Sequence, residues 1–341
     1  KQRPKTKSSC LSARKILINY KYLWSSRDVI KMATFNTLPD NIILDILSYL
    51  PVKDLCLTGR VNRRCRRIVR DNTLWRHVDL TPYRLDMSKM WKVIRAHFSD
   101  VLISMKIRGF SKSAGPKNKK YSMSDAMLKD LSERCPNIKI LHLYQCNTDN
   151  LDCQKLPATL TTLAVRSSVW QPRWFKLDSN KTALLPQLKS LNVSGSARVD
   201  NFDIEDLNQW SNLEELMLNE CYRVGQNGLT SIAMNLTKLK YLELAGTTIT
   251  ELSMHHISRH LKLLEKLNLS RTAGLSDACL DEISSGLTQL RYLNISGCSE
   301  ITSGGIKSLL LLKHLETLDL TNIISSDTEL KDIQSTPTFP K

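Results

Sequence analysis

Long apolar runs are missing from this chain of 341 residues. The run of leucines at residues 309–312 is four residues long, whereas a helix that crosses a bilayer needs about 18 apolar residues. The sequence therefore predicts no membrane-spanning helix. A chain of this length is sufficient for two domains, or for one small module followed by an extended array.

Paired cysteine motifs are also missing. The nine cysteines form neither CxxC pairs nor a dense disulfide framework. This pattern is typical of buried structural thiols in a reducing compartment. We therefore expect a cytoplasmic or nuclear protein without disulfides and without a cysteine-based metal site.

No catalytic motif is recognisable either. His256 and His260 have the i, i+4 spacing of a metal-binding pair, but no glutamate lies between them as in HExxH. We interpret both as surface histidines of an outer helix. Gly304 and Gly305 open a helix and form a turn; they do not make a phosphate loop. We expect no catalytic residue, no metal site and no cofactor.

Half of the basic excess lies in the first 31 residues. The chain carries a net charge of +16, and residues 1–31 hold nine Lys and Arg against one Asp, which is 9 − 1 = +8. This segment has no long apolar core, so it is not a secretory signal, and Met32 is a natural start. We interpret residues 1–31 as a basic leader that is disordered or lies outside the native protein. A basic tail with a localisation role or affinity for nucleic acid is the alternative.

Residues 37–80 form a small module rich in apolar side chains. Twenty of its 44 residues are Leu, Ile, Val, Tyr, Trp or Cys. A module of this size buries only about 60% of its surface when it folds alone. Some of these apolar side chains are therefore expected to contact a partner.

Three helices are predicted in this module. Thr37 and Asp40 have the spacing of a capping box, and Pro39 lies where a proline of the first turn is tolerated. Pro51 ends the first helix. The apolar stripe of that helix is Ile43, Leu47 and Leu50. The second helix is expected to run through Asp54, Leu55 and Leu57, and the third from about Val61 to Val69.

The order LP, apolar helix, LP, DL, VNRRCRRI and LW closely resembles the F-box, a three-helix module that docks on the Skp adaptor of cullin-RING ubiquitin ligases. Many F-boxes carry tryptophan where Cys65 stands, which leaves the third helix less well filled. A generic helical bundle, with Trp75 as core filler, is the alternative. The resemblance implies adaptor contacts through Leu38, Pro39, Ile42, Ile43, Ile46, Leu50, Pro51, Leu55 and Leu57.

A run of arginines follows helical spacing in this module. We interpret it as the solvated face of the third helix, opposite an acidic partner surface. Binding to nucleic acid is the alternative, but no aromatic residues are interleaved to stack on bases. The run consists of Arg60, Arg63, Arg64, Arg66, Arg67 and Arg70.

The rest of the chain repeats the pattern LxxLxLxx followed by a small residue. Copies begin at Ile138, Leu160, Leu188, Leu213, Leu239, Leu264, Leu290 and Leu315, at intervals of 22, 28, 25, 26, 25, 26 and 25 residues. An imperfect earlier copy begins at Leu102. Each copy predicts a short strand with inward leucines, a compact side chain at the following turn, and a helix.

The whole layout resembles the F-box/leucine-rich-repeat family. The predicted fold class is α/β, with a three-helix F-box followed by a solenoid whose parallel strands line the concave face and whose helices line the convex face. We expect the leader at 1–31, the F-box at 32–80, a helical linker with the imperfect repeat at 81–135, the repeat array at 136–323, and a polar tail at 324–341.

Residues that flank the inward leucines are expected on the concave face. Aromatic residues dominate the binding energy of many interfaces, so the tyrosines are the expected anchors. Ordinary solvated strand positions are the alternative. The candidate substrate contacts are Tyr144, Arg166, Met217, Tyr241, Glu243 and Tyr292.

Trp170 and Trp174 lie in the longest interval of the array. They either pack on the solenoid or form a contact site, and the sequence leaves both open.

The resemblance implies a non-catalytic substrate receptor. Its partners would be the Skp adaptor, through it a cullin and a RING subunit, and a protein substrate on the repeats. A membrane or nucleic-acid partner is not expected. A scaffold that acts without cullin, or a clamp like ribonuclease inhibitor, is the alternative.

Overall fold

The computed structural model describes residues 35, 37–83, 85–109, 123–177 and 184–323. The predicted leader at 1–31 and tail at 324–341 lie outside the described residues. The chain divides into two compact units, residues 1–49 and 50–341. Among the described residues, no helix has the length and apolar character needed to cross a membrane.

The first unit contains helix α2, Asp40–Ser48. Pro39 is its N-cap, with φ −58° and ψ 153°, one position before the first turn in which the sequence predicted it. The predicted capping box of Thr37 and Asp40 stays a prediction. The buried residues of α2 are Ile43 and Leu47, which follow the predicted stripe.

The second unit begins with two further helices. Helix α3, Val52–Thr58, starts after the N-cap Pro51. Helix α4, Arg63–Val69, begins two residues later than predicted, because the side chain of Asn62 accepts a hydrogen bond from the Cys65 N–H at 2.7 Å and caps it. A 3₁₀ turn, η2 (Asn72–Trp75), follows.

A sheet of ten parallel strands in sequential order dominates the described part of this unit. The solenoid starts earlier than the predicted boundary at residue 136. Val78 of the added strand β1 and Leu80 directly after it are both buried, so they follow the repeat alternation, but the predicted F-box included these residues. The strands are β1 (His77–Asp79), β2 (Ser104–Arg108), β3 (Ile140–Tyr144), β4 (Thr162–Arg166), β5 (Ser190–Asn192), β6 (Glu215–Met217), β7 (Tyr241–Glu243), β8 (Lys266–Asn268), β9 (Tyr292–Asn294) and β10 (Thr317–Asp319).

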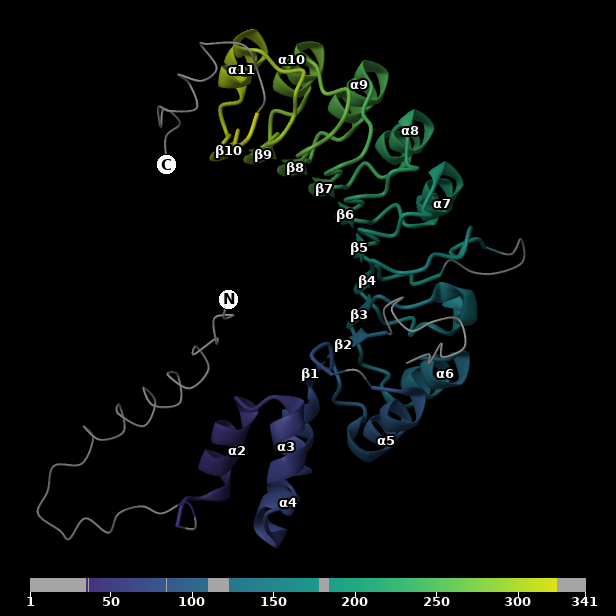
Figure 1. Cartoon of the computed structure of the whole chain (residues 1–341), viewed down its shortest axis with the longest axis vertical. Coiled ribbons are helices and arrows are strands. Elements are labelled where there is room, and N and C mark those ends of the chain that lie inside the picture. The colour runs from purple at the N-terminus through teal and green to yellow at the C-terminus, as the bar shows by residue number, and fades with distance from the viewer. Residues whose placement is uncertain (1–34, 36, 84, 110–122, 178–183, 324–341) are drawn as a thin grey trace, which may run out of the picture. The chain divides into compact units, whose positions relative to one another are not determined.

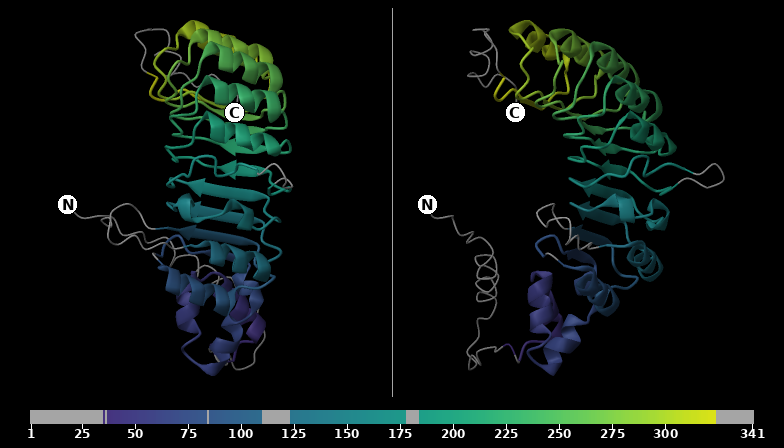
Figure 2. Two further views of the ribbon diagram at one scale, coloured as in Figure 1. Left: turned by 90° about the vertical axis from the view of Figure 1, so that its right-hand side faces the viewer. Right: turned by 45° about the vertical axis from the view of Figure 1, so that its right-hand side comes forward.

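Helices and 3₁₀ turns connect successive strands. In Figure 1 the strands from β1 to β10 line the inner side of an arc and the helices lie outside it, and Figure 2 shows the strands stacked in parallel. This arrangement agrees with the predicted fold class. The helices are α5 (Met87–His97), α6 (Asp125–Arg134), α7 (Asn201–Glu205), α8 (Gln226–Asn235), α9 (Glu251–His260), α10 (Asp277–Gly286) and α11 (Ser303–Ser308). The 3₁₀ turns are η3 (Thr148–Asn150), η4 (Cys153–Lys155), η5 (Asp206–Gln209) and η6 (Leu309–Leu311).

The compact residue of each repeat joins neighbouring turns, as predicted. The Ser196 hydroxyl donates to the Val165 carbonyl at 3.1 Å and accepts from the Ser168 N–H at 3.4 Å. The Cys298 thiol donates to the Leu269 carbonyl at 3.3 Å. All seven of these side chains are buried, so they bind backbone groups that water cannot reach. They are Cys146, Ser168, Ser196, Cys221, Thr247, Thr272 and Cys298.

The two tryptophans of the longest interval pack on the solenoid. Trp170 is 1% and Trp174 5% exposed, and their ring centroids lie 5.5 Å apart. Phe175 contacts both rings and also that of Trp210, at 4.9 Å. This aromatic cluster fills the outer layer between β4 and β5, where no helix forms among the described residues. Of the two possibilities left open by the sequence, packing is correct.

Candidate protein-binding surfaces

Exposed apolar side chains are concentrated near the first three helices. Twelve large apolar side chains are exposed among the described residues, and five of them lie within residues 35–61, a stretch of 27 residues. Scattered exposed apolar residues are normal, but a concentration marks an interaction site. The five are Phe35, Ile46, Tyr49, Leu57 and Val61.

Three of these five residues were not among the predicted adaptor contacts. Tyr49 is 71% and Val61 73% exposed, and Phe35 precedes the motif. They were missed because the motif was matched on its LP and helix elements. Apolar residues at the ends of helices and in turns were the signal in the sequence that would have indicated these exposed side chains.

The nine predicted adaptor contacts differ in their exposure. Ile46 and Leu57 are 42% and 48% exposed, which suits a contact role. Ile43 is completely buried and Leu55 is 3% exposed, so both side chains lie in the core of this structure, and the contact role predicted for them stays a prediction. Pro39 and Pro51 are exposed N-caps, and the half-buried members are Leu38, Ile42 and Leu50.

The small residue of the third helix lies in the core. Cys65 is 2% exposed, and Ile68 and Val69 of the same helix are also buried. The arginines form the solvated face that was predicted, with Arg64 half-buried and the other five exposed. An acidic partner surface opposite them remains a prediction.

The strand register aligns the concave residues in rows. One row runs through Glu215, Tyr241, Lys266 and Tyr292 on successive strands. The Lys266 ammonium lies 4.7 Å from the centroid of the Tyr241 ring, a cation–π distance. The predicted contacts Tyr241 and Tyr292 therefore flank one lysine.

The neighbouring row and the first strands hold the other predicted contacts. Met217 and Glu243 are paired in register on β6 and β7. Tyr144 and Arg166 are paired on β3 and β4, with the guanidinium 5.6 Å from the ring centroid. Arg166 is exposed and the other five predicted contacts are half-buried. The structure thus brings the six residues together in two groups on one face.

Charges of both signs lie along this face, as the sequence indicated. Strands β2 to β4 carry Lys106, Arg108 and Arg166, and the carboxylates Glu215 and Glu243 lie on β6 and β7. Asp79 on β1 is in register with Lys106, and Lys266 lies on β8.

His142 lies in the basic part of the concave face. Burial lowers the pKa of its imidazole, and the nearby Lys106 and Arg166 lower it further. Its Nδ1 lies 3.2 Å from the Tyr144 hydroxyl. The imidazole is therefore neutral at pH 7, and the charge of this region comes from the lysine and the arginines.

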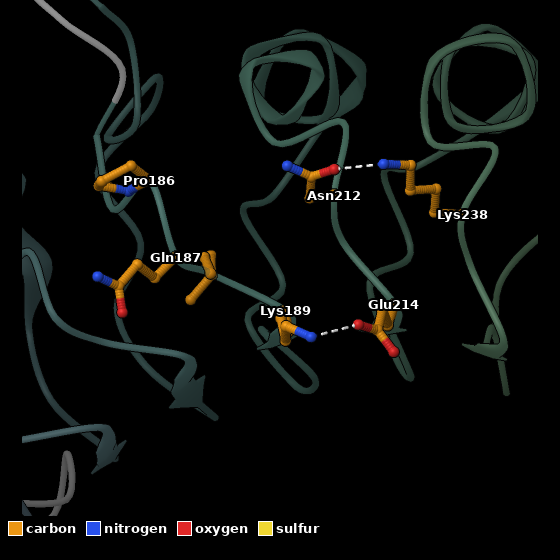
Figure 3. A pocket seen from close by; sticks show the side chains of 7 residues that line it. Pro186, Gln187, Lys189, Asn212, Glu214 and Lys238 are labelled. Carbon is orange, nitrogen blue, oxygen red and sulfur yellow. Dashed lines mark hydrogen bonds and ion pairs between the residues drawn. The ribbon is translucent and has the colours of Figure 1, made fainter.

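A pocket of about 290 Å³ lies at the start of the strands (Figure 3). Glu214 accepts from the Lys189 ammonium at 2.7 Å and from Lys240 at 2.9 Å. The hydrogen bond from Lys189 is the largest cause, and together with the bond from Lys240 it lowers the pKa of the Glu214 carboxyl to about 2. Lys238 donates to the Asn212 side chain at 2.5 Å. The charged groups of this pocket form hydrogen bonds within the protein, and these bonds connect neighbouring repeats.

The histidines of α9 lie in the outer layer and are half-buried. His255 Nδ1 lies 3.1 Å from a carboxylate oxygen of Glu282 on α10, a partner that the sequence did not suggest. The His256 and His260 rings are stacked, with centroids 6.1 Å apart. Within the described ranges, no three His, Cys, Asp or Glu residues are arranged to hold a metal ion.

A curved parallel sheet with helices outside and inward leucines at a period of about 25 residues defines a leucine-rich-repeat solenoid. The F-box-like family matches residues 35–81. The chain is 34% identical over 269 residues to F-box/LRR-repeat protein 12 of Homo sapiens, covering 78% of this chain and 80% of that protein. The Mus musculus protein of the same name is 34% identical over 248 residues, covering 72% and 74%.

The chain therefore belongs to the F-box/LRR-repeat protein family. The crystal structure of an internalin from Listeria monocytogenes is also similar, with a TM-score of 0.47 and 18% identity, covering 75% of this chain and 70% of that one.

Proposed function

We propose that this protein is the substrate-recognition subunit of an SCF-type E3 ubiquitin ligase. Its F-box docks on the Skp adaptor and its repeats hold the protein that is to be ubiquitinated. Membership of the F-box/LRR-repeat family supports this function. The observation that carries it is the concentration of five exposed apolar side chains within residues 35–61.

The energetics favour a partner on the F-box. Burying a side chain the size of Val, Leu or Ile contributes about 1.5–3 kcal/mol. Ile46, Tyr49, Leu57 and Val61 are each at least 42% exposed, so an adaptor that covers them removes a large apolar area from water. The exposed arginines of α4 favour an adaptor with acidic groups.

The concave face is the proposed substrate surface. Tyr241 and Tyr292 on either side of Lys266 supply rigid aromatic area, and Met217 with Glu243 extends it. Tyr144 and Arg166 form the second group of contacts. The role of the protein is to position its substrate beside the ubiquitin-carrying enzyme that the cullin recruits.

The cysteines support a non-catalytic role in the cytoplasm or nucleus. The eight described cysteines are all free thiols, which suits a reducing compartment. Burial raises the pKa of Cys135 to about 11 and that of Cys221 to about 12. Such thiols are poor nucleophiles at neutral pH.

Affinity capture from cells tests this function. The wild-type chain is expected to co-purify the adaptor, a cullin and a RING subunit, and the captured complex is expected to transfer ubiquitin to a bound protein. The double variant Leu38→Ala, Pro39→Ala is expected to lose all three subunits while its solenoid stays folded. The adaptor captured without cullin would favour a cullin-free scaffold, and undiminished adaptor capture by the double variant would contradict the assignment.

A further inference from the structure

The last strand of the array, β10, has no outer helix of its own among the described residues. Each strand from β5 to β9 is followed by one, from α7 to α11. Strand β10 lies at one end of the arc in Figure 1, and the described residues end shortly after it, at residue 323. Within the described residues, the outer layer is therefore one helix short of the sheet at this end.

The apolar residues that β10 adds to the core are incompletely covered. Leu290 and Leu293 of the preceding repeat are completely buried, whereas Leu315 and Leu318, at the same positions of the last repeat, are half-buried. Exposed apolar surface at the end of a solenoid promotes association, so terminal repeats need a unit that covers it. Among the described residues, the core of the array is thus open at β10.

The outer layer is open at the same end. Leu310 directly follows the buried Leu309 and is 68% exposed, and Leu311 beside it is 67% exposed. The next helix covers the residue that corresponds to Leu310 in α9, since a Cβ on Gly286 of α10 would lie 2.6 Å from the Ser258 carbonyl oxygen. No described helix covers Leu310 in this way. The corresponding residues of the three preceding repeats are at most 5% exposed, and they are Ala233, Ser258 and Ser284.

The outer helices of the last four repeats that have one share a short sequence pattern. Each begins with an N-cap residue, has an apolar residue four positions later, and has a second apolar residue three positions after the first. Both apolar residues are buried in all four repeats, so they hold the helix on the core. The sets are Gly225, Leu229 and Ile232; Thr250, Met254 and Ile257; Ser276, Leu280 and Ile283; and Thr302, Ile306 and Leu309.

Residues 326–333 lie outside the described residues, and their sequence repeats this pattern. It reads SDTELKDI and matches SDACLDEI, residues 276–283 at the start of α10, in its first two residues and in both apolar residues. Serine is a favoured N-cap residue. Leu330 follows Ile306 by 330 − 306 = 24 residues, close to the 25 or 26 residues between the same positions of the earlier repeats. The sequence of this segment is therefore that of one more outer helix.

We propose that residues 326–333 cover the open end of the array as the outer helix of the last repeat. Leu330 and Ile333 take the places that Leu280 and Ile283 take two repeats earlier, and the segment packs against α11. The occupant of this apolar face is thus the chain itself. Because the segment is tethered close to β10, it has a high effective concentration at this face, and a free partner must compete with it.

Two consequences follow for the end of the chain. The polar tail predicted at 324–341 begins only after residue 333, and the apolar face at β10 is not a substrate surface. The proposal is independent of the proposed function, since an array needs a covered end whatever its concave face binds.

Amide hydrogen exchange of the full chain tests the proposal. In Leu330→Lys, Ile333→Lys, the amides of α11 and β10 are expected to exchange about 10-fold faster or more than in the wild type, since lysine cannot replace a buried apolar contact. The amides of α8 are expected to keep their protection, because a repeat contacts only its neighbours. Protection of α8 also reports that the variant is folded.

A matched variant separates the apolar contacts from the added charge. Thr328→Lys, Ser335→Lys places two lysines in the same part of the chain, at positions that correspond to the exposed Ala278 and Ser285 of α10. Its α11 and β10 amides should exchange like those of the wild type. Equal exchange rates of these amides in both double variants would overturn the proposal.

The wild type alone provides a second test, which does not depend on the folding of any variant. In a helix capped by Ser326, the amides of residues 330–333 are the first to donate hydrogen bonds within the helix. They are expected to exchange about 10-fold slower or more than in an unfolded peptide of the same sequence. Exchange at the unfolded rate would overturn the proposal.

Sedimentation velocity distinguishes the chain's own segment from a second copy on this face. The wild type and Leu310→Lys, Leu311→Lys are expected to have the same state of association at every concentration. A wild-type dimer that this variant converts to a monomer would assign the face to a second copy and overturn the proposal.

Discussion

The Trp75 indole and the His97 imidazole stack with their centroids 3.8 Å apart and 13° between their planes. Trp75 lies near the end of the F-box-like match, and His97 is the last residue of α5, the first helix of the array. The Trp75 indole N–H donates to the Val69 carbonyl at 2.8 Å. One indole therefore joins α4 of the F-box to the first repeat, and it makes residues 50–341 one structural unit at this point.

This stack predicts a pH-dependent stability. Burial and the nearby Arg70 lower the pKa of His97 below its usual value. Because the folded protein disfavours protonation of His97, the stabilising contribution of its neutral imidazole is fully present above the ordinary histidine pKa of about 6.5. This contribution is lost as the pH falls through the lowered pKa of the folded state. We expect His97→Phe, which keeps the stack without titrating, to show a smaller fall in Tm between pH 7.5 and 5. Identical pH profiles for the two proteins would contradict this role.

The aromatic cluster predicts a large cost for removing Trp174. Its ring contacts Trp170 and Phe175, and its N–H donates to the Leu151 carbonyl at 2.5 Å. Trp174→Ala is expected to lower the free energy of unfolding by about 3–5 kcal/mol in urea denaturation. Phe202→Ala, at a side chain 60% exposed, is the control and should change it by about 0.5 kcal/mol or less. Similar losses in both variants would contradict a packing role for the cluster.

The compact residues that join neighbouring turns predict a smaller loss of stability on substitution. Ser196→Ala removes the donor to the Val165 carbonyl and the acceptor of the Ser168 N–H. Both backbone groups are buried, so the expected loss of stability is about 1–3 kcal/mol. Ser285→Ala removes the hydroxyl of an exposed serine on α10 and is expected to be nearly neutral. An unchanged free energy of unfolding in Ser196→Ala would show that these hydrogen bonds are not needed for the stacking of repeats.

The thiols predict a graded reactivity. Cys56 is half-buried, whereas the other seven described cysteines are buried. In a Cys10→Ser background, a thiol reagent at pH 8 is expected to modify Cys56 first in the native protein. Cys221 should react only after denaturation, because burial raises its pKa to about 12. Mass mapping of the labelled peptides measures this order, and native labelling of Cys221 at the rate of Cys56 would contradict it.

The repeat spacing predicted much of the array. The leucines at positions such as Leu216 and Leu218 are completely buried, and their flanking residues lie on the open face as expected. Alternation along a strand fixes which side a residue faces. The short strand β1 was missed because Val78 and Leu80, which follow the same alternation, lie within the predicted F-box.

The burial depth of individual residues could not be predicted in the same way. Ile43 and Ile46 lie three residues apart in one apolar helix, yet one is fully buried and the other 42% exposed. A polar groove lined by Arg166 and Arg271 was also missed, because these residues are 105 residues apart in the sequence and only the stacking of repeats brings them together. The local spacing of residues in the sequence predicts neither the burial of a side chain nor its neighbours in other repeats.

Calorimetric titration of the purified chain with the Skp adaptor tests the central claim most directly. We predict one-to-one binding by the wild type and a loss of at least about 100-fold in Ile46→Lys, Leu57→Lys, since each lysine replaces a buried apolar contact worth about 2 kcal/mol or more. Met234→Lys, Leu252→Lys alters two apolar residues of similar exposure on α8 and α9, and it should bind like the wild type. Absent binding by the wild type, or equal affinity in both variants, would contradict docking through the F-box.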